Sequence, residues 1–190
     1  MRALISWSGG KDSAFALRRA RESGVEPVAL LTSFNEATDQ IPIHDIPMSW
    51  IRRHAEMLGL PLRTVPLPWP CSNDEYLGRM RAVWGAAAAE MGADCIVFGD
   101  IHLEDIREFR ERGLAGSGLT PIFPLWGYRS MKLAADIISA GINATIASVD
   151  ERRLARELVG RRFDAGFVAD LPADVDPCGE NGEFHTAVWL

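Results

Sequence analysis

The feature that most constrains this chain is a turn rich in glycine and serine near its N-terminus, residues 6–13 (Ser-Trp-Ser-Gly-Gly-Lys-Asp-Ser). The apolar residues 3–5 before it predict a buried strand, and residues 13–23 after it predict a helix. Glycines can turn several N–H groups towards one point, and a helix N-terminus adds free N–H groups and a positive dipole end. Together with the charge of Lys11, these groups predict a binding site for phosphate.

This turn differs from the common P-loop. A P-loop requires a glycine where this chain has Ile5, and a Ser or Thr directly after the lysine, where this chain has Asp12. The run at residues 8–13 (SGGKDS) instead resembles the SGGxDS signature of the PP-loop ATP pyrophosphatases, which cleave ATP between its α- and β-phosphates. The alternative is a Gly-Gly turn with a solvated lysine, which the position of the run between a strand and a helix disfavours.

Short apolar runs alternate with amphipathic segments along the first part of the chain. The expected strands are residues 3–5, 27–34, 61–66 and 95–98, and the expected helices are residues 13–23, 49–58 and 73–91. Ser72 and Glu75 form a capping-box pattern at the start of the last helix, and residues 35–48 are expected to be a loop. The alternation predicts an α/β fold with a doubly wound, mainly parallel, five-stranded sheet.

We expect one domain over residues 1–190, because this length is sufficient to bury a full core. Its nucleotide-binding core would be residues 1–100, and a smaller substrate-side lobe would be residues 101–190. In that lobe, residues 130–140 are an expected helix, and residues 142–149 and 184–190 are expected strands.

Composition argues against several classes of protein. A net charge of −6 and a pI near 5.2 argue against a broad nucleic-acid surface, which needs clustered Lys and Arg. The three cysteines lie far apart without a CxxC pair, which predicts a reducing, cytoplasmic location. No apolar run approaches the roughly 20 residues that a membrane span requires, and the turn comes too early in the chain for a signal peptide.

Thr32 and Ser33, with Phe34, end the second expected strand. Ligands of parallel sheets bind beyond the carboxyl ends of strands, so these residues are candidates for contact with the adenine and ribose of a nucleotide. A strand end that simply leads into a loop is the alternative.

A second group of reactive side chains lies at residues 176–186 (DPCGENGEFHT). Glu180 and Glu183 could hold a metal or an amine, and His185 could transfer a proton. The alternative is an acidic loop that ends in a strand, with His185 packed or hydrogen-bonded. The residue types alone leave both open.

Four segments together resemble the diphthine–ammonia ligase branch of the PP-loop ATPases: residues 8–13, 99–101 (GDI), 124–126 (PLW) and 178–186 (CGENGEFHT). The resemblance spans residues 3–189 and implies a nucleotide α-hydrolase fold, which is Rossmann-like and of the HUP type. It implies that ATP and Mg²⁺ are used to adenylate a carboxylate, with release of pyrophosphate, and to amidate it with ammonia. Residues 98–105 resemble the short prokaryotic members, which implies an acid other than diphthine.

The resemblance also implies roles for individual residues. Those expected to bind ATP are Ser8, Gly9, Gly10, Lys11, Asp12, Ser13, Thr32, Ser33 and Gly99. Those expected to be catalytic are Lys11, Asp100, Glu180, Glu183 and His185, and those expected to hold Mg²⁺ are Asp12 and Asp100. Lys11 is expected at a surface turn, so that its loss would spare the fold.

Two other functions stay open. One is a PP-loop enzyme that modifies tRNA by thiolation or lysidine formation, against which the acidic pI counts. The other is a non-catalytic protein that binds adenine nucleotides. For the ligase, the expected partners are a small or protein-borne carboxylate and ammonia, with neither nucleic acid nor membrane, and possible partners include a second copy of the chain.

Overall fold

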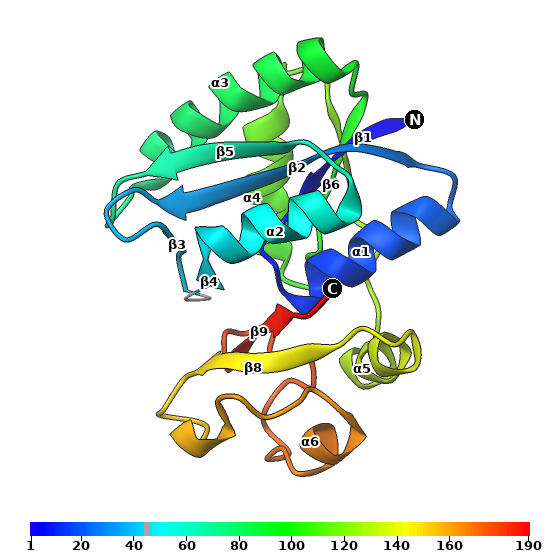
Figure 1. The fold of residues 1–190 in the computed structure, drawn as a ribbon, viewed down its shortest axis with the longest axis vertical. Helices are drawn as coiled ribbons and strands as arrows, with labels where there is room; N and C mark the ends of the chain where they lie inside the picture. The colour runs from blue at the N-terminus through cyan, green and yellow to red at the C-terminus, as the bar shows by residue number, and fades with distance from the viewer. Residues whose placement is uncertain (44–45) are drawn as a thin grey trace.

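A parallel sheet forms the centre of the computed structural model, which describes residues 1–43 and 46–190 (Figure 1). Its parallel strands lie in the order β5–β2–β1–β6–β7. Their bounds are β1 Arg2–Ser6, β2 Glu26–Asn35, β5 Leu62–Leu67, β6 Cys95–Val97 and β7 Thr120–Ile122. The expected α/β fold with a mainly parallel sheet is confirmed.

The sheet has seven strands, however, and not the expected five. The two additional strands, β3 (Gln40–Ile41) and β4 (Ile46–Pro47), form an antiparallel extension at the end of β2. Residues 35–48 were expected to be a loop, and that expectation is wrong for these strands, which are too short to produce a periodic pattern. His44 and Asp45, in the same segment, lie outside the described residues.

Helices cover both faces of the sheet. Along β1, Ala3 and Ile5 belong to one hydrophobic cluster and Leu4 to the other, as the alternation of a strand requires. The first cluster includes side chains of α1 (Lys11–Glu22), α2 (Met48–Leu58) and α5 (Ser130–Ser139). The second includes side chains of α3 (Asn73–Met91) and α4 (Glu104–Leu114).

Local sequence accounts for several helix ends. The hydroxyl of Ser72 accepts a hydrogen bond of 3.2 Å from the N–H of Glu75, which confirms the expected cap of α3. Gly59 and Gly92 end α2 and α3 in left-handed conformations. No helix in the described part of the chain is long and apolar enough to cross a membrane.

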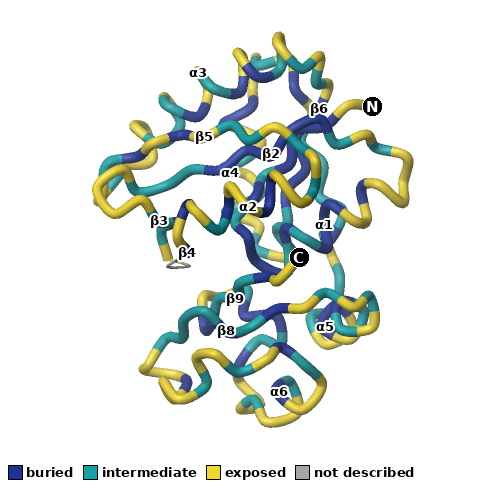
Figure 2. The backbone as a smooth tube through the Cα atoms, in the orientation of Figure 1, coloured by how far each residue is buried: buried dark blue, intermediate teal, exposed yellow. Residues whose placement is uncertain are grey.

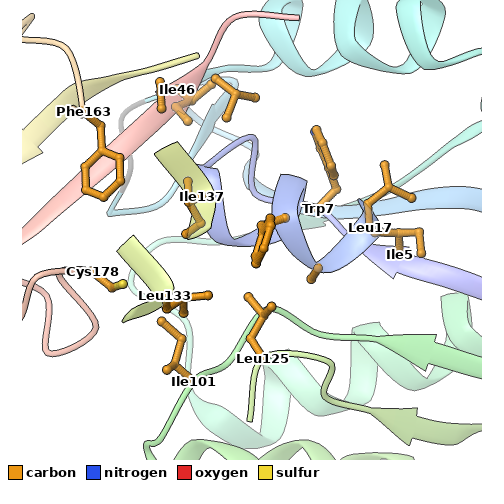
Figure 3. Close-up of a cluster of buried hydrophobic side chains, with 14 of the residues drawn as sticks. Ile5, Trp7, Leu17, Ile46, Ile101, Leu125, Leu133, Ile137, Phe163 and Cys178 are labelled. Atoms are coloured by element: carbon orange, nitrogen blue, oxygen red, sulfur yellow. The ribbon is translucent and has the colours of Figure 1, made fainter. Parts of the chain in front are cut away.

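A smaller antiparallel sheet of β8 (Ala144–Val149) and β9 (Phe184–Val188) lies beside the main one, with η1 (Arg156–Leu158) and α6 (Ala165–Ala169) next to it (Figure 1). Buried positions continue from the main sheet into this region (Figure 2). Figure 3 shows Leu17 of α1, Leu133 of α5 and Phe163 within one cluster. The smaller sheet therefore shares a hydrophobic core with one face of the main sheet.

The order of the strands fixes where a ligand can bind. The chain proceeds outward from β1 through β2 to β5, and then returns to the other side of β1 as β6. The loops after β1 and β6 therefore diverge, and in open α/β sheets such a switch point forms a crevice at the carboxyl edge.

Candidate active site

The turn after β1 is shorter than the sequence predicts, because α1 begins at Lys11 and not at Ser13. Gly9 has a φ of +79°, and a Cβ there would lie 2.7 Å from Cδ1 of Ile51 on α2. A Cβ on Gly10 would lie 3.2 Å from the carbonyl oxygen of Thr186 on β9. The two glycines thus let α2 and β9 pack directly against the turn.

Hydrogen bonds within the protein hold this turn. The N–H of Gly10 donates to Oγ of Ser8 at 3.3 Å, and the N–H of Lys11 donates to Oγ1 of Thr186 at 3.0 Å. The N–H of Val188 donates to the carbonyl of Gly9 at 2.9 Å. The amides of Gly10 and Lys11 are therefore already bonded within the protein, and they are not among the N–H groups of the turn that could face a ligand.

Lys11 is buried, with 2% of its side chain exposed, so the expected surface position is wrong. Its Nζ donates to Oδ2 of Asp12 at 2.9 Å and to the carbonyl of Cys178. The same Nζ lies 5.2 Å and 5.4 Å from the ring centroids of Phe163 and Phe184. Burial by itself would lower the pKa of Lys11, but the carboxylate of Asp12 and the neighbouring Cys178 raise it, so the amine stays charged.

A cavity of about 200 Å³ opens beside this turn, at the switch point of the sheet. The candidate residues that line it are Ser8, Lys11, Asp12, Ser13, Gly99, Asp100, Glu180 and His185. A Cβ on Gly99 would lie 3.1 Å from the backbone carbon of Asp12, so the glycine lets the loop after β6 approach α1 closely. Tertiary structure thus brings the two ends of the chain into one site.

Glu180 has the most unusual electrostatics in this cavity. Its Oε1 accepts a hydrogen bond of 2.8 Å from the N–H of Ile101. Burial raises the pKa of Glu180 to about 7, and the nearby carboxylates of Asp12 and Asp100 act in the same direction. A carboxyl group with this pKa can accept and release a proton at neutral pH.

Glu183 does not line the cavity and is fully buried. Its Oε1 accepts from the N–H of Asp176 at 3.0 Å, and its Oε2 accepts from the N–H of Asn181 at 3.1 Å. Arg153 forms an ion pair with it at 3.5 Å. These bonds tie together the loop that carries Glu180.

A larger cavity of about 620 Å³ adjoins the small one. Aliphatic and aromatic side chains dominate its wall, among them Leu31, Tyr76 and Phe109, and Ser33 lies in it as a nucleotide contact would require. Thr32 does not line this cavity and donates its hydroxyl to the carbonyl of Trp7 at 2.7 Å. The hydroxyl of Thr32 is thus used within the protein, and its expected contact with a nucleotide stays a prediction.

Comparison with known families agrees with this arrangement. The sequence pattern of the diphthamide synthase N-terminal domain matches residues 1–121, and that of the diphthamide synthase C-terminal domain matches residues 129–189. The chain belongs to the diphthamide synthase family.

One curated relative in this family is the diphthine–ammonia ligase of Schizosaccharomyces pombe. It is 26% identical over 206 residues, an alignment that covers 99% of this chain and 34% of the relative. This chain therefore spans about a third of the length of that relative. Among solved structures, a predicted subunit of tRNA methyltransferase from Methanocaldococcus jannaschii aligns with a TM-score of 0.45 and 19% identity, covering 73% of this chain and 76% of that one.

The resemblance to this family implies that Mg²⁺ is bound, and two carboxylates of the small cavity are suitable ligands for this ion. Oδ1 of Asp12 and Oδ2 of Asp100 are buried without a hydrogen-bond partner among the described residues. Mg²⁺ prefers oxygen ligands and usually takes one or two carboxylates together with phosphate oxygens of a substrate. Within residues 1–43 and 46–190, no group of three or more His, Cys, Asp or Glu side chains is arranged so that it could hold a metal ion by itself.

Sequence reasoning missed two residues of this candidate site. Arg110 lines both cavities, but it lies in a run of alternating charges that is typical of a solvated helix face. Thr186 was seen only as the end of a reactive segment, not as a partner of the first turn of α1. The site also argues against a nucleophilic Cys178, because burial raises the pKa of its thiol to about 12.

Proposed function

We propose that this protein is an ATP-dependent ligase that adenylates a carboxylate, releases pyrophosphate, and joins the activated acid to ammonia with release of AMP. One observation carries the proposal: a largely apolar cavity and a small charged cavity meet at the carboxyl edge of a parallel sheet. Membership of the diphthamide synthase family supports it.

The two cavities suit different parts of ATP. The larger one has the aromatic and aliphatic wall that a base and ribose need, with Ser33 as a polar contact. The smaller one holds Lys11, Ser8 and Ser13 beside the first turn of α1, where phosphate is favoured. ATP would therefore lie across the junction, with its outer phosphates in the small cavity.

The chemistry follows from that placement. An oxygen of the substrate carboxylate would attack the α-phosphorus, forming a P–O bond as the bond to pyrophosphate breaks. The positive charge of Lys11, fixed by Asp12, would stabilise the negative charge that develops. Asp12 and Asp100 would hold Mg²⁺, which when bound neutralises charge on phosphate oxygens.

Ammonia would then attack the acyl carbon and displace AMP. Glu180 lies in the same cavity with a pKa of about 7, so its carboxylate can take the proton that the nitrogen loses. His185 lines the cavity as well and is the second candidate for proton transfer. Glu183 would not contact the substrate and would act by positioning Glu180, because it is buried and holds the loop of Glu180 in place.

The substrate acid is best tested by product analysis. The purified protein is incubated with ATP, Mg²⁺, ¹⁵N-ammonium and either diphthine-bearing elongation factor 2 or a panel of small carboxylic acids. The proposal expects AMP and pyrophosphate in equal amounts, together with a ¹⁵N-labelled amide, only when an acid is present. Release of ADP, or no nucleotide turnover with any acid, would contradict it.

A second candidate is a protein that binds adenine nucleotides without turnover. The bonding of Lys11 favours it, because Nζ already contacts Asp12 and Cys178 and the N–H contacts Thr186. This candidate predicts ATP binding by calorimetry with no pyrophosphate release under the same conditions.

A further inference from the structure

Arg110 of α4 lies where the two cavities meet. Only Ser6, Ser8 and Arg110 line both cavities among the described residues. Of these three residues, Arg110 alone carries a charge. The junction between the apolar and the charged cavity is therefore positively charged on one side.

Neighbouring side chains fix the direction of its guanidinium. Nη1 of Arg110 donates a hydrogen bond of 2.9 Å to the hydroxyl of Tyr76 on α3. The guanidinium lies 5.2 Å from the ring centroid of Phe98, and that ring stacks on Phe123 at 5.5 Å. An arginine held in this way is preorganised, so binding a ligand costs little side-chain entropy.

The same guanidinium retains unused hydrogen-bonding capacity. Its Nε is buried and has no hydrogen-bond partner among the described residues. Oδ2 of Asp100 forms an ion pair with this Nε at 3.5 Å, but neither atom has a hydrogen-bond partner among the described residues. A buried, charged donor without an acceptor is unfavourable, and oxygen atoms of an anionic ligand would satisfy it.

We propose that Arg110 binds the α-phosphoryl group of the nucleotide. This inference rests on the proposed function, which places the nucleoside in the large cavity and the outer phosphates in the small one. The α-phosphoryl group connects those two parts, so it must lie at the junction that Arg110 lines. The planar fork of an arginine matches two oxygens of a phosphoryl group. Arg110 would then stabilise that group while the carboxylate attacks it.

Calorimetric titration of adenosine, AMP and ATP in Mg²⁺ buffer tests this role in wild type, R110M and R110K. R110M removes a charge-assisted contact, so it should weaken the binding of AMP and of ATP by a similar factor, about 10- to 100-fold. The affinity for adenosine should stay within about twofold of the wild-type value. R110K keeps the charge without the fork and should weaken both nucleotides less. R107M is the matched control: Arg107 is on the same helix and stacks on Phe123 and Trp126, but lines neither cavity.

The outcomes separate this inference from the proposed function. Equal affinity of R110M and wild type for AMP would overturn the role of Arg110 while leaving the ligase proposal intact. A loss of affinity for ATP but not for AMP would place Arg110 beside the outer phosphates, and it would also overturn the proposed contact with the α-phosphoryl group. If the wild-type protein binds neither nucleotide, the result contradicts the proposed function, and the role of Arg110 that rests on it is contradicted as well. If circular dichroism shows that R110M is unfolded, R110K takes its place in the comparison. A ratio of AMP affinity to adenosine affinity that is the same in R110K as in wild type would then contradict the inference.

Discussion

The backbone N–H of Lys11 donates a hydrogen bond of 3.0 Å to the hydroxyl of Thr186, which lies 175 residues further along the chain. This bond joins the first turn of α1 to the last strand of the smaller sheet. Two residues before Lys11 and two residues after Thr186, the N–H of Val188 donates to the carbonyl of Gly9 and repeats the connection. The turn after β1 and the strand β9 are thus one structural unit.

Replacement of Thr186 should weaken that unit. T186V keeps the shape of the side chain but leaves the N–H of Lys11 buried without an acceptor, at a cost of about 1–3 kcal/mol in the free energy of unfolding. T186S keeps the hydroxyl and should lose less than T186V. Urea denaturation measures both. Equal stability of T186V and wild type would show that the bond contributes nothing to stability.

Replacement of Lys11 should affect folding as well as turnover. K11A empties the space between Phe163 and Phe184 and should lower the free energy of unfolding by about 3 kcal/mol. K11M fills that space but, like K11A, leaves the carboxylate of Asp12 and the carbonyl of Cys178 without their donor, so it should be destabilised less than K11A but not be neutral. Chemical denaturation compares the two, and K11M, which stays folded, should release no pyrophosphate.

Stability should depend on pH through Glu180. Its pKa in the folded protein is about 7, against an ordinary value of 4.5. Between these values the folded protein binds more protons than the unfolded chain, so a rise in pH favours unfolding. The stability of wild type relative to E180Q should therefore fall from about pH 5 to pH 7 and then level off. A difference that does not change with pH would refute the raised pKa.

Glu183 should behave as a positioning residue. E183Q removes one charged acceptor and should increase hydrogen exchange at the amides of Asp176 and Asn181, which bond to its two oxygens. R153M removes the ion pair with Glu183 at 3.5 Å and the bonds of Arg153 to Asp174, but it leaves both oxygens of Glu183 in place. It should therefore affect the amides of Asp176 and Asn181 less than E183Q does. Hydrogen-exchange mass spectrometry of residues 174–184 makes the comparison. Unchanged protection with lost ligation would instead support a direct catalytic role.

Much of the fold follows from local sequence. The parallel strands have apolar runs, and the two ends of α3 can be recognised from Ser72 before the helix and Gly92 after it. Such signals act over a few residues, so they can be read without knowing what packs against them. The short strands β3 and β4 and the helix α4 were not predicted, since β3 and β4 have two residues each and α4 is dominated by charged side chains.

The sequence by itself determined that this chain has a turn rich in glycine and serine after its first strand, for which it predicts phosphate binding, and a second segment of reactive side chains near residue 180. Only the tertiary structure decided that Lys11 is buried, that Glu183 supports the loop, and that Arg110 lies between two cavities. The physical reason is the distance along the chain over which each kind of interaction acts. Backbone propensities and caps depend on neighbours within a turn or two, whereas burial and the pKa of a carboxyl group depend on segments that meet only when the whole core has packed.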